Sequence, residues 1–149
     1  MKKYLLILLV VIIGINSCEV DDFCTEATTP RLIISFYDFE DPSTYKEAPI
    51  YVWANDKDSI YEAIIVDSIF VPLDPSTQNL TYKLSQTKEV DQVDFSYEVE
   101  DIFVSESCGF KSTFKNLKIV SNTNVWIKRI DISNAIIENE TQAHVKIYH

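Results

Sequence analysis

The chain has 149 residues and carries 13 Lys and Arg against 23 Asp and Glu, a formal net charge of −10. An acidic protein of this kind repels phosphate backbones, so the composition disfavours nucleic acid as a partner. Hydrophobic residues make up 46% of the chain and no repeat or low-complexity stretch divides it, so we expect one folded domain.

The first 17 residues have the pattern of a secretion signal. Lys2 and Lys3 precede an apolar run from Tyr4 to Ile13, which is the order found in signal peptides. As a helix this run rises only about 15 Å, half of the roughly 30 Å hydrocarbon core of a bilayer. It is therefore too short for a stable transmembrane helix, and we expect residues 1–17 to be removed.

The signal ends in GINSC, with the small Ser17 directly before Cys18. This order resembles the lipobox of bacterial lipoproteins, from which Asn16 departs. The resemblance implies that Cys18 becomes the N-terminus and carries acyl chains such as palmitate, each buried methylene contributing roughly 0.8 kcal/mol to anchoring. We then expect residues 18–29 to form a tether and the membrane to be a partner. The alternative is an ordinary secreted protein in which Cys18 is a third structural cysteine.

Dense apolar runs follow the tether. They are typical of central strands that are covered on both faces or that change register at a bulge. They occupy residues 31–39, 49–54, 62–71 and 125–132. Strict alternation marks strands with one buried and one wet face. It places Val93, Phe95, Tyr97 and Val99 together, separates Ala143, Val145 and Ile147 from His144, Lys146 and Tyr148, and recurs around Tyr82 and Leu84. Residues 110–120 form a further predicted strand.

No window of helical length has helical spacing, so the prediction is an all-β domain over residues 30–149. Seven to nine short strands favour an antiparallel β-sandwich, immunoglobulin-like or similar, with a closed barrel as the alternative. Gly109 is the only glycine after the signal peptide, so the turns at residues 54–59, 72–79 and 121–124 must use Pro, Asp, Asn and Ser.

Cys24 and Cys108 remain to pair if Cys18 carries lipid, in a compartment where disulfides persist. We predict this disulfide, whose loop of about 85 residues gives on the order of 4 to 5 kcal/mol in the chain-entropy model. The alternative makes Cys108 a nucleophile with His144 as its base, but SESCGF matches no nucleophile elbow. Gly109 is expected to permit a tight bend or close packing beside Cys108.

Aromatic and acidic residues are the candidates for ligand binding. Trp53 and Trp126 stack against sugars or a partner's side chains if they are exposed, whereas the alternative places both in the core. Acidic loops containing Asp38, Glu40, Asp41, Asp56 and Asp58 offer oxygen ligands to Ca²⁺, but no EF-hand pattern is present. His144 and His149 are expected to point to opposite faces of one strand. We therefore predict no metal site and no cofactor.

Several motifs together carry a family resemblance. The lipobox, the early Cys24, TPRLIISFYDF, VPLDPSTQNLTYKL, FVSESCGF and NETQAHVKIYH resemble an uncharacterised family of Bacteroidota envelope lipoproteins, a domain of unknown function. The resemblance implies a β-rich domain in the outer membrane and implies no activity. Glu19, Asp21 and Asp22 also resemble an export signal of that phylum, which favours the cell surface over a periplasm-facing position. Two DSI triplets resemble its O-glycan acceptor and make Ser59 and Ser68 candidates.

The function we expect from these features is not enzymatic. The prediction is a lipid-anchored accessory or binding component of an envelope protein complex. One alternative is a surface glycan-binding module, which requires an exposed tryptophan. A second is a hydrolase, which requires a cleft with a perturbed acid or nucleophile.

Overall fold

The structure is a computed structural model that describes residues 24–25, 28–55 and 57–149. Within these residues it contains nine strands and no helix, as the sequence predicts. The strands are Leu32–Tyr37 (β1), Ala48–Ala54 (β2), Ser59–Val66 (β3), Ser68–Val71 (β4), Asn79–Ser85 (β5), Val90–Ser105 (β6), Gly109–Asn122 (β7), Arg129–Ile132 (β8) and Val145–Tyr148 (β9).

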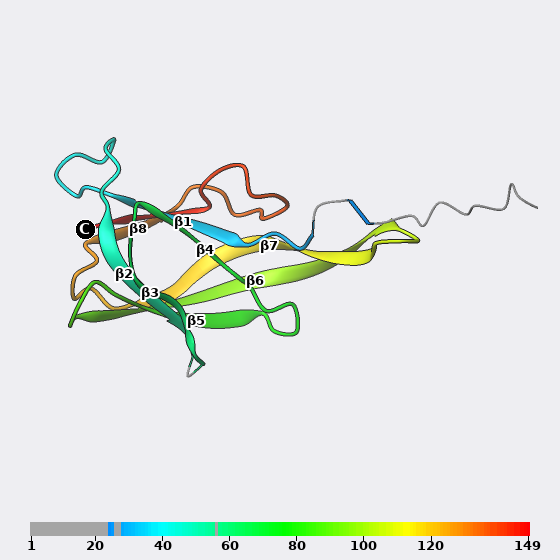
Figure 1. Ribbon diagram of the computed structural model, residues 1–149, viewed down its shortest axis with the longest axis horizontal. Helices are drawn as coiled ribbons and strands as arrows, with labels where there is room; N and C mark the ends of the chain where they lie inside the picture. Colours follow the sequence, from blue (N-terminus) through cyan, green and yellow to red (C-terminus); the bar gives the residue numbers. More distant parts are fainter. Residues whose placement is uncertain (1–23, 26–27, 56) are drawn as a thin grey trace, which may run out of the picture.

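The strands form two sheets that face each other across an apolar core (Figure 1). One sheet has the order β4-β1-β9-β8 and the other the order β3-β2-β5-β6-β7. The predicted β-sandwich is confirmed, and the closed-barrel alternative is wrong for the described residues. One pairing departs from the antiparallel prediction, because β1 and β9 run parallel, with Ile34 opposite Val145.

Alternation in β6 and β5 builds one wall of the core. Val93, Phe95 and Tyr97 are buried on the inner face of β6, and Tyr82 and Leu84 are buried on β5, as their period-2 spacing predicts. All six residues of strand β1 are buried, so both of its faces are covered, and it lies between β4 and β9 in its sheet. The prediction of a central strand is therefore confirmed at residues 32–37.

At residues 62–71 the central-strand alternative is wrong, and the alternative of a register change at a bulge is found instead. The segment divides at Asp67 into β3 and β4, which belong to different sheets. Strand β3 lies at a sheet edge, where Ile64 and Ile65 are exposed. Its pairing with β2 has two register shifts, and Ala63 has a φ of 55°. An apolar run predicts burial, but the bulged edge leaves part of this run in solvent.

Two predictions near the C-terminus also need correction. Only Arg129–Ile132 of residues 125–132 is strand, because the preceding backbone N–H groups bind a side chain. His144 and Tyr148 were expected on the wet face of their strand, yet both are buried. Strand β9 is central in its sheet, and the His144 ring accepts a hydrogen bond from Ile33 N. Both faces of this strand therefore carry buried side chains.

The turns use polar residues where many hairpins use glycine, as predicted. Asn55 takes a φ of 50° between β2 and β3, a conformation that asparagine tolerates. The Asp74 carboxylate accepts hydrogen bonds from the backbone N–H and hydroxyl of Ser76 between β4 and β5. Such side-chain bonds to nearby backbone stabilise turns without glycine.

Candidate functional site

The hairpin of β6 and β7 extends well past the rest of the sandwich (Figure 1). Phe114, which lies opposite Val99, and the adjacent Thr113 are the last buried residues of the hairpin before its turn. Beyond them the side chains of β6 are exposed up to Phe103. We call residues 102–111 the hairpin tip. The tip lies beyond the rest of the sandwich, and its apolar side chains Ile102, Phe103 and Phe110 are exposed.

An aromatic pair lies at the hairpin tip. Phe103 and Phe110 are directly opposite each other in the register, with ring centroids 5.3 Å apart in an edge-to-face arrangement. Their exposed fractions are 56% and 70%. Two large rings on one face form an apolar patch that nothing in the described part of the chain covers.

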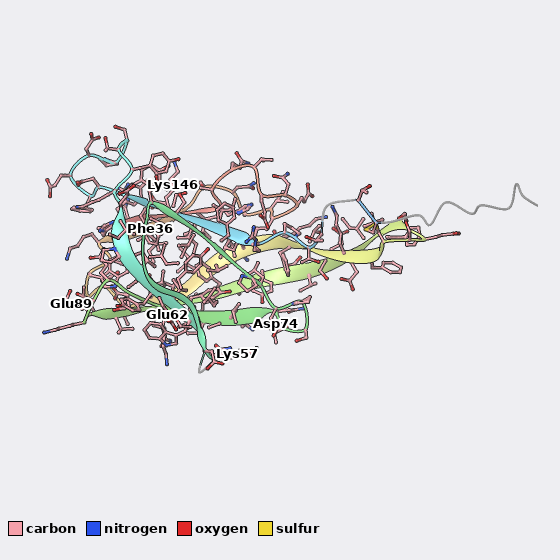
Figure 2. The ribbon with its side chains drawn as sticks, viewed as in Figure 1. Phe36, Lys57, Glu62, Asp74, Glu89 and Lys146 are labelled. Carbon is pink, nitrogen blue, oxygen red and sulfur yellow. A yellow bond between two sulfur atoms is a disulfide. The ribbon has the colours of Figure 1, made fainter. Side chains whose placement is uncertain are left out.

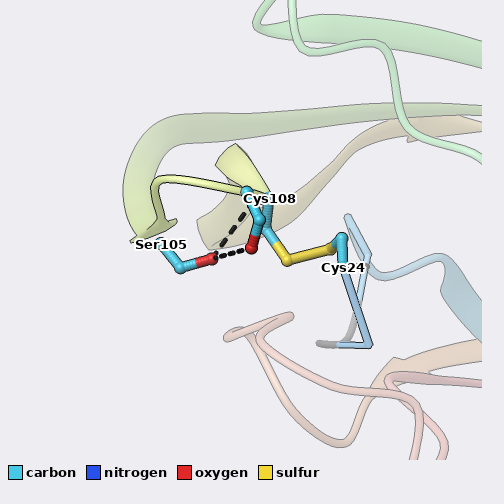
Figure 3. Close-up of a disulfide and its surroundings, with 4 residues drawn as sticks. Cys24, Ser105 and Cys108 are labelled. Atoms are coloured by element: carbon cyan, nitrogen blue, oxygen red, sulfur yellow. Dashed lines mark hydrogen bonds between the residues drawn. A yellow bond between two sulfur atoms is a disulfide. The ribbon is translucent and has the colours of Figure 1, made fainter. Parts of the chain in front are cut away.

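The turn of the hairpin carries the predicted disulfide (Figure 3). Cys24 and Cys108 are joined with an S–S distance of 1.97 Å and a Cα separation of 4.9 Å. The backbone N–H of Cys108 donates to Ser105 Oγ at 3.1 Å, which closes the turn. The disulfide thus fastens the beginning of the described chain to the far end of the hairpin.

Gly109 follows the disulfide with a φ of 71°, and a Cβ added at this position would meet no atom within 4 Å. The tight-bend alternative is therefore correct, and the close-packing alternative is wrong. Gly109→Val is expected to lower the free energy of unfolding by about 1 to 2 kcal/mol, because a β-branched residue is strained at positive φ. Urea denaturation measures this, with Gly109→Asn as the control that tolerates the same φ. Equal midpoints for the valine variant and the wild type would contradict the role.

The segment after Cys24 is fastened along the hairpin towards the sandwich. Thr29 Oγ1 accepts a hydrogen bond from Ser112 N at 3.0 Å. The Arg31 guanidinium donates two hydrogen bonds to Glu140, of 2.9 and 2.7 Å, and these bonds lower the pKa of the Glu140 carboxyl. Thr29, which belongs to the predicted tether of residues 18–29, is thus hydrogen-bonded to the hairpin.

The structure separates the two candidate tryptophans. Trp126 is buried in the core with its indole N–H bonded to Leu84 O, so the prediction that it stacks on a ligand is wrong. The Trp126 ring packs beside the rings of Phe36 and His149. Trp53 is half-buried on the outer face of β2. A ligand-stacking role in this chain therefore rests on Trp53 alone.

An open cavity of ≈ 840 Å³ lies beside the β2–β3 and β4–β5 turns. Apolar residues such as Leu73 and Leu80 line it, and Lys57, Asp58 and Asp74 add charge. Lys57 and Asp74 lie on the same side of the molecule (Figure 2). The Asp74 carboxylate is held by Ser76, whose hydrogen bonds lower its pKa. None of the described residues that line the cavity is aromatic, so they offer no stacking surface of the kind that sugar recognition uses.

The groups proposed for nucleophilic catalysis make structural contacts instead. Cys108 is oxidised in the disulfide and offers no thiolate. Burial lowers the pKa of His144, and its Nδ1 already accepts a hydrogen bond from Ile33 N. The expectation of a solvated His144 is therefore wrong. The ring of His149 lies against Phe36 and Trp126, away from the turn that holds Cys108.

The acidic loops act as turn braces. Asp38 accepts the N–H of Glu40 and pairs with Lys46 at 3.3 Å, while Asp41 accepts hydrogen bonds from Ser43 and Thr44. Among the described residues no group of three or more His, Cys, Asp or Glu is arranged to hold a metal ion. Asp58 lines the open cavity, and Asp56 lies outside the described residues.

The two serine candidates differ in accessibility. Ser59 is exposed at the start of β3, and its hydroxyl donates to Tyr61 O at 2.6 Å. Ser68 is half-buried in β4, with its hydroxyl 2.9 Å from that of Ser35. Residues 1–17 and the predicted lipidation site Cys18 lie outside the described residues. No helix in the described ranges is long and apolar enough to cross a membrane.

Asp91 is an important residue that the sequence patterns alone did not single out. It is fully buried on β6, where its carboxylate accepts hydrogen bonds from Thr123 Oγ1 and the backbone N–H groups of Val125, Trp126 and Ile127, at 2.6 to 2.9 Å. Burial raises its pKa, but these four donors outweigh burial and leave the pKa below its usual value. A signal was present, because Asp91 shares the inward parity of Val93.

Comparison with known proteins identifies one family. Residues 49–149 match the model of a family described as a family of unknown function, DUF6452. No curated protein and no solved structure matches the chain. The matched range covers the cavity, the hairpin tip and Cys108, whereas Cys24 and β1 precede it.

Proposed function

The chain belongs to the DUF6452 family of unknown function, and from that premise we propose that it is a non-catalytic, lipid-anchored protein of the bacterial outer membrane. Cys18 holds the acyl chains, and the sandwich is an accessory or binding component of an envelope assembly. The observation that carries this proposal is the disulfide. It joins Cys108 at the hairpin tip to Cys24, which lies only six residues after Cys18.

The hairpin suits the role of a rigid spacer between the anchor and the sandwich. From Val99 to Ser105 it is an antiparallel ladder that spans about 20 Å at the usual rise per residue. The anchored end lies at its tip, and Glu89 in the β5–β6 turn lies at the opposite end of the molecule (Figure 2). The domain thereby presents its far end to partners at a defined distance from the membrane.

The chemistry of the site supports a binding rather than a catalytic role. The candidate nucleophile Cys108 is closed in the disulfide, and its proposed base His144 is buried in the sandwich. The Asp residues with lowered pKa values, such as Asp41 and Asp74, are held by hydrogen bonds in turns. Each of these groups has a structural partner that accounts for it.

The anchor is tested by Cys18→Ser in a Bacteroidota host. The wild type is expected in the membrane fraction with acyl chains detectable by mass spectrometry, and Cys18→Ser is expected to lose both properties. The matched control is Cys24→Ser with Cys108→Ser, which removes the disulfide and leaves Cys18 in place. Membrane retention of Cys18→Ser at the wild-type level would overturn the lipid anchor.

The assembly is tested by cross-linking in the native membrane and recovery through a tag inserted between Lys88 and Glu89. Both residues are exposed in the β5–β6 turn, and Figure 2 shows Glu89 at the end of the molecule opposite the hairpin tip. Recovery of one protein in near-stoichiometric amount supports an assembly subunit, whereas recovery of the lipoprotein alone contradicts it. Protease treatment of intact cells separates surface display, our proposal, from the periplasm-facing alternative.

A further inference from the structure

The hairpin tip is tied closely to the proposed lipid anchor. Cys24 lies six residues after Cys18 and is bonded to Cys108 in the turn. A fully extended chain spans at most about 3.6 Å per residue, so this link reaches about 20 Å. With Cys18 acylated, the turn is therefore held within about 20 Å of the acyl chains, from where it can reach the headgroup layer, which is about 5 to 8 Å thick on each side of the core.

The tip presents the side chains that suit a membrane interface. Phe103 and Phe110 form their exposed pair on one face of the ladder, and Ile102 is also exposed, at 37%. Trp and Tyr are enriched at the level of the lipid headgroups, and Phe lies on the buried face of helices that bind at this interface. Lys111 adjoins Phe110 and is half-buried, and a lysine in such a position can extend its ammonium towards phosphate groups.

The charges around the tip favour a zwitterionic lipid surface. Asp101 and Glu106 flank the aromatic pair, and Glu19, Asp21 and Asp22 lie in the link to Cys18. Anionic headgroups would repel these carboxylates. The attraction must therefore come from apolar contact, which the two phenylalanine rings supply.

We propose that the hairpin tip inserts Phe103 and Phe110 into the interface of the bilayer that holds the lipid anchor. This inference rests on the proposed acylation of Cys18. The tether keeps the tip at a high effective concentration next to the lipid, so weak apolar contacts suffice to hold it there. Two fixed points, the acyl chains and the aromatic pair, then orient the sandwich relative to the membrane.

The test uses the full-length lipoprotein in phosphatidylcholine vesicles with brominated acyl chains, which quench tryptophan only at close approach. Phe110→Trp places a reporter at the tip, and the emission of Trp53 and Trp126 is subtracted with the wild type. Phe39→Trp is the matched control, because Phe39 is 43% exposed and belongs to the β1–β2 loop, which lies at the other end of the molecule (Figure 1). Flotation of the same samples reports anchoring.

The tip reporter is expected to lose roughly half of its emission on brominated lipid, and the Phe39→Trp reporter roughly none, as interfacial insertion of one end predicts. Flotation without quenching at residue 110 overturns the insertion and leaves the anchor standing. Equal quenching at both positions also overturns it, because the domain then lies flat on the membrane. Absence from the floated vesicles overturns both the anchor and the insertion.

Discussion

Asp91→Ala is expected to destabilise the domain by about 3 to 5 kcal/mol, the largest effect of any single substitution considered. The carboxylate is fully buried, and its removal strands the buried N–H groups of Trp126 and Ile127 together with those of Val125 and the Thr123 hydroxyl. Each unsatisfied buried donor costs about 1 to 3 kcal/mol. Urea denaturation followed by near-ultraviolet circular dichroism, which reports the packing of Trp126, measures the loss.

Asp94→Ala is the matched control for this substitution. Asp94 lies three residues further along the same strand and accepts hydrogen bonds from Thr81, Gln92 and Ser121, but it is on the outer face and half-buried. Solvent can replace these partners, so its loss is expected to cost about 1 kcal/mol or less. Equal losses for the two alanine variants would show that burial of the Asp91 carboxylate carries no special weight.

The same carboxylate predicts a dependence of stability on acid. The hydrogen bonds to Asp91 outweigh its burial and lower its folded pKa, so the unfolded state takes up a proton first. Its contribution is complete above the unfolded pKa of about 3.9 and is lost as the pH falls through the folded pKa. The difference in unfolding free energy between the wild type and Asp91→Asn is therefore expected to shrink below about pH 4.

The period-2 patterns were reliable because they express a local property of the backbone. Alternation at Val93, Phe95 and Tyr97 predicts which face is buried wherever the strand lies in a sheet. Position in the sheet is not local, so the apolar run at residues 62–71 predicts a central or a bulged strand equally well, whereas β3 is an exposed, bulged edge. The prediction of a solvent-exposed His144 is wrong for the same reason. Its ring is buried and accepts a hydrogen bond from Ile33 on β1, the strand next to β9.

The candidate site was only partly predictable. The pairing of Cys24 with Cys108 followed from the compartment and from the assignment of Cys18 to lipid. The exposure of Phe103 and Phe110 depends on a hairpin that continues past the facing sheet, and the 16 residues of β6 far exceed the usual strand length. Past Val99 the alternation breaks at Asp101, and a continuous apolar run from Ile102 to Val104 follows. Such a run is typical of a buried strand, so the pattern does not show that the sandwich ends here.

Replacing both Cys24 and Cys108 with serine is expected to lower the free energy of unfolding by about 2 to 3 kcal/mol. The bridge closes a sequence separation of 84, for which the chain-entropy model gives on the order of 4 to 5 kcal/mol. The full value is not expected, because the folded variant also gains freedom. Residues before Pro30 are held by contacts such as Thr29 to Ser112, and they are free to fray without the disulfide.

Urea denaturation of the oxidised and the reduced wild type checks this expectation, because reduction should reproduce the serine variant while that variant ignores the reductant. A loss near zero would mean that the bridge only fastens a frayed end, and a loss above about 5 kcal/mol would mean that the sandwich needs the segment after Cys24 in order to fold. Neither Phe95 nor Ile34, both in the core, is paired with a residue of the hairpin tip. An intermediate loss is therefore what a bridge at the end of a projecting hairpin should produce, with the fold preserved and the hairpin tip released from the anchor.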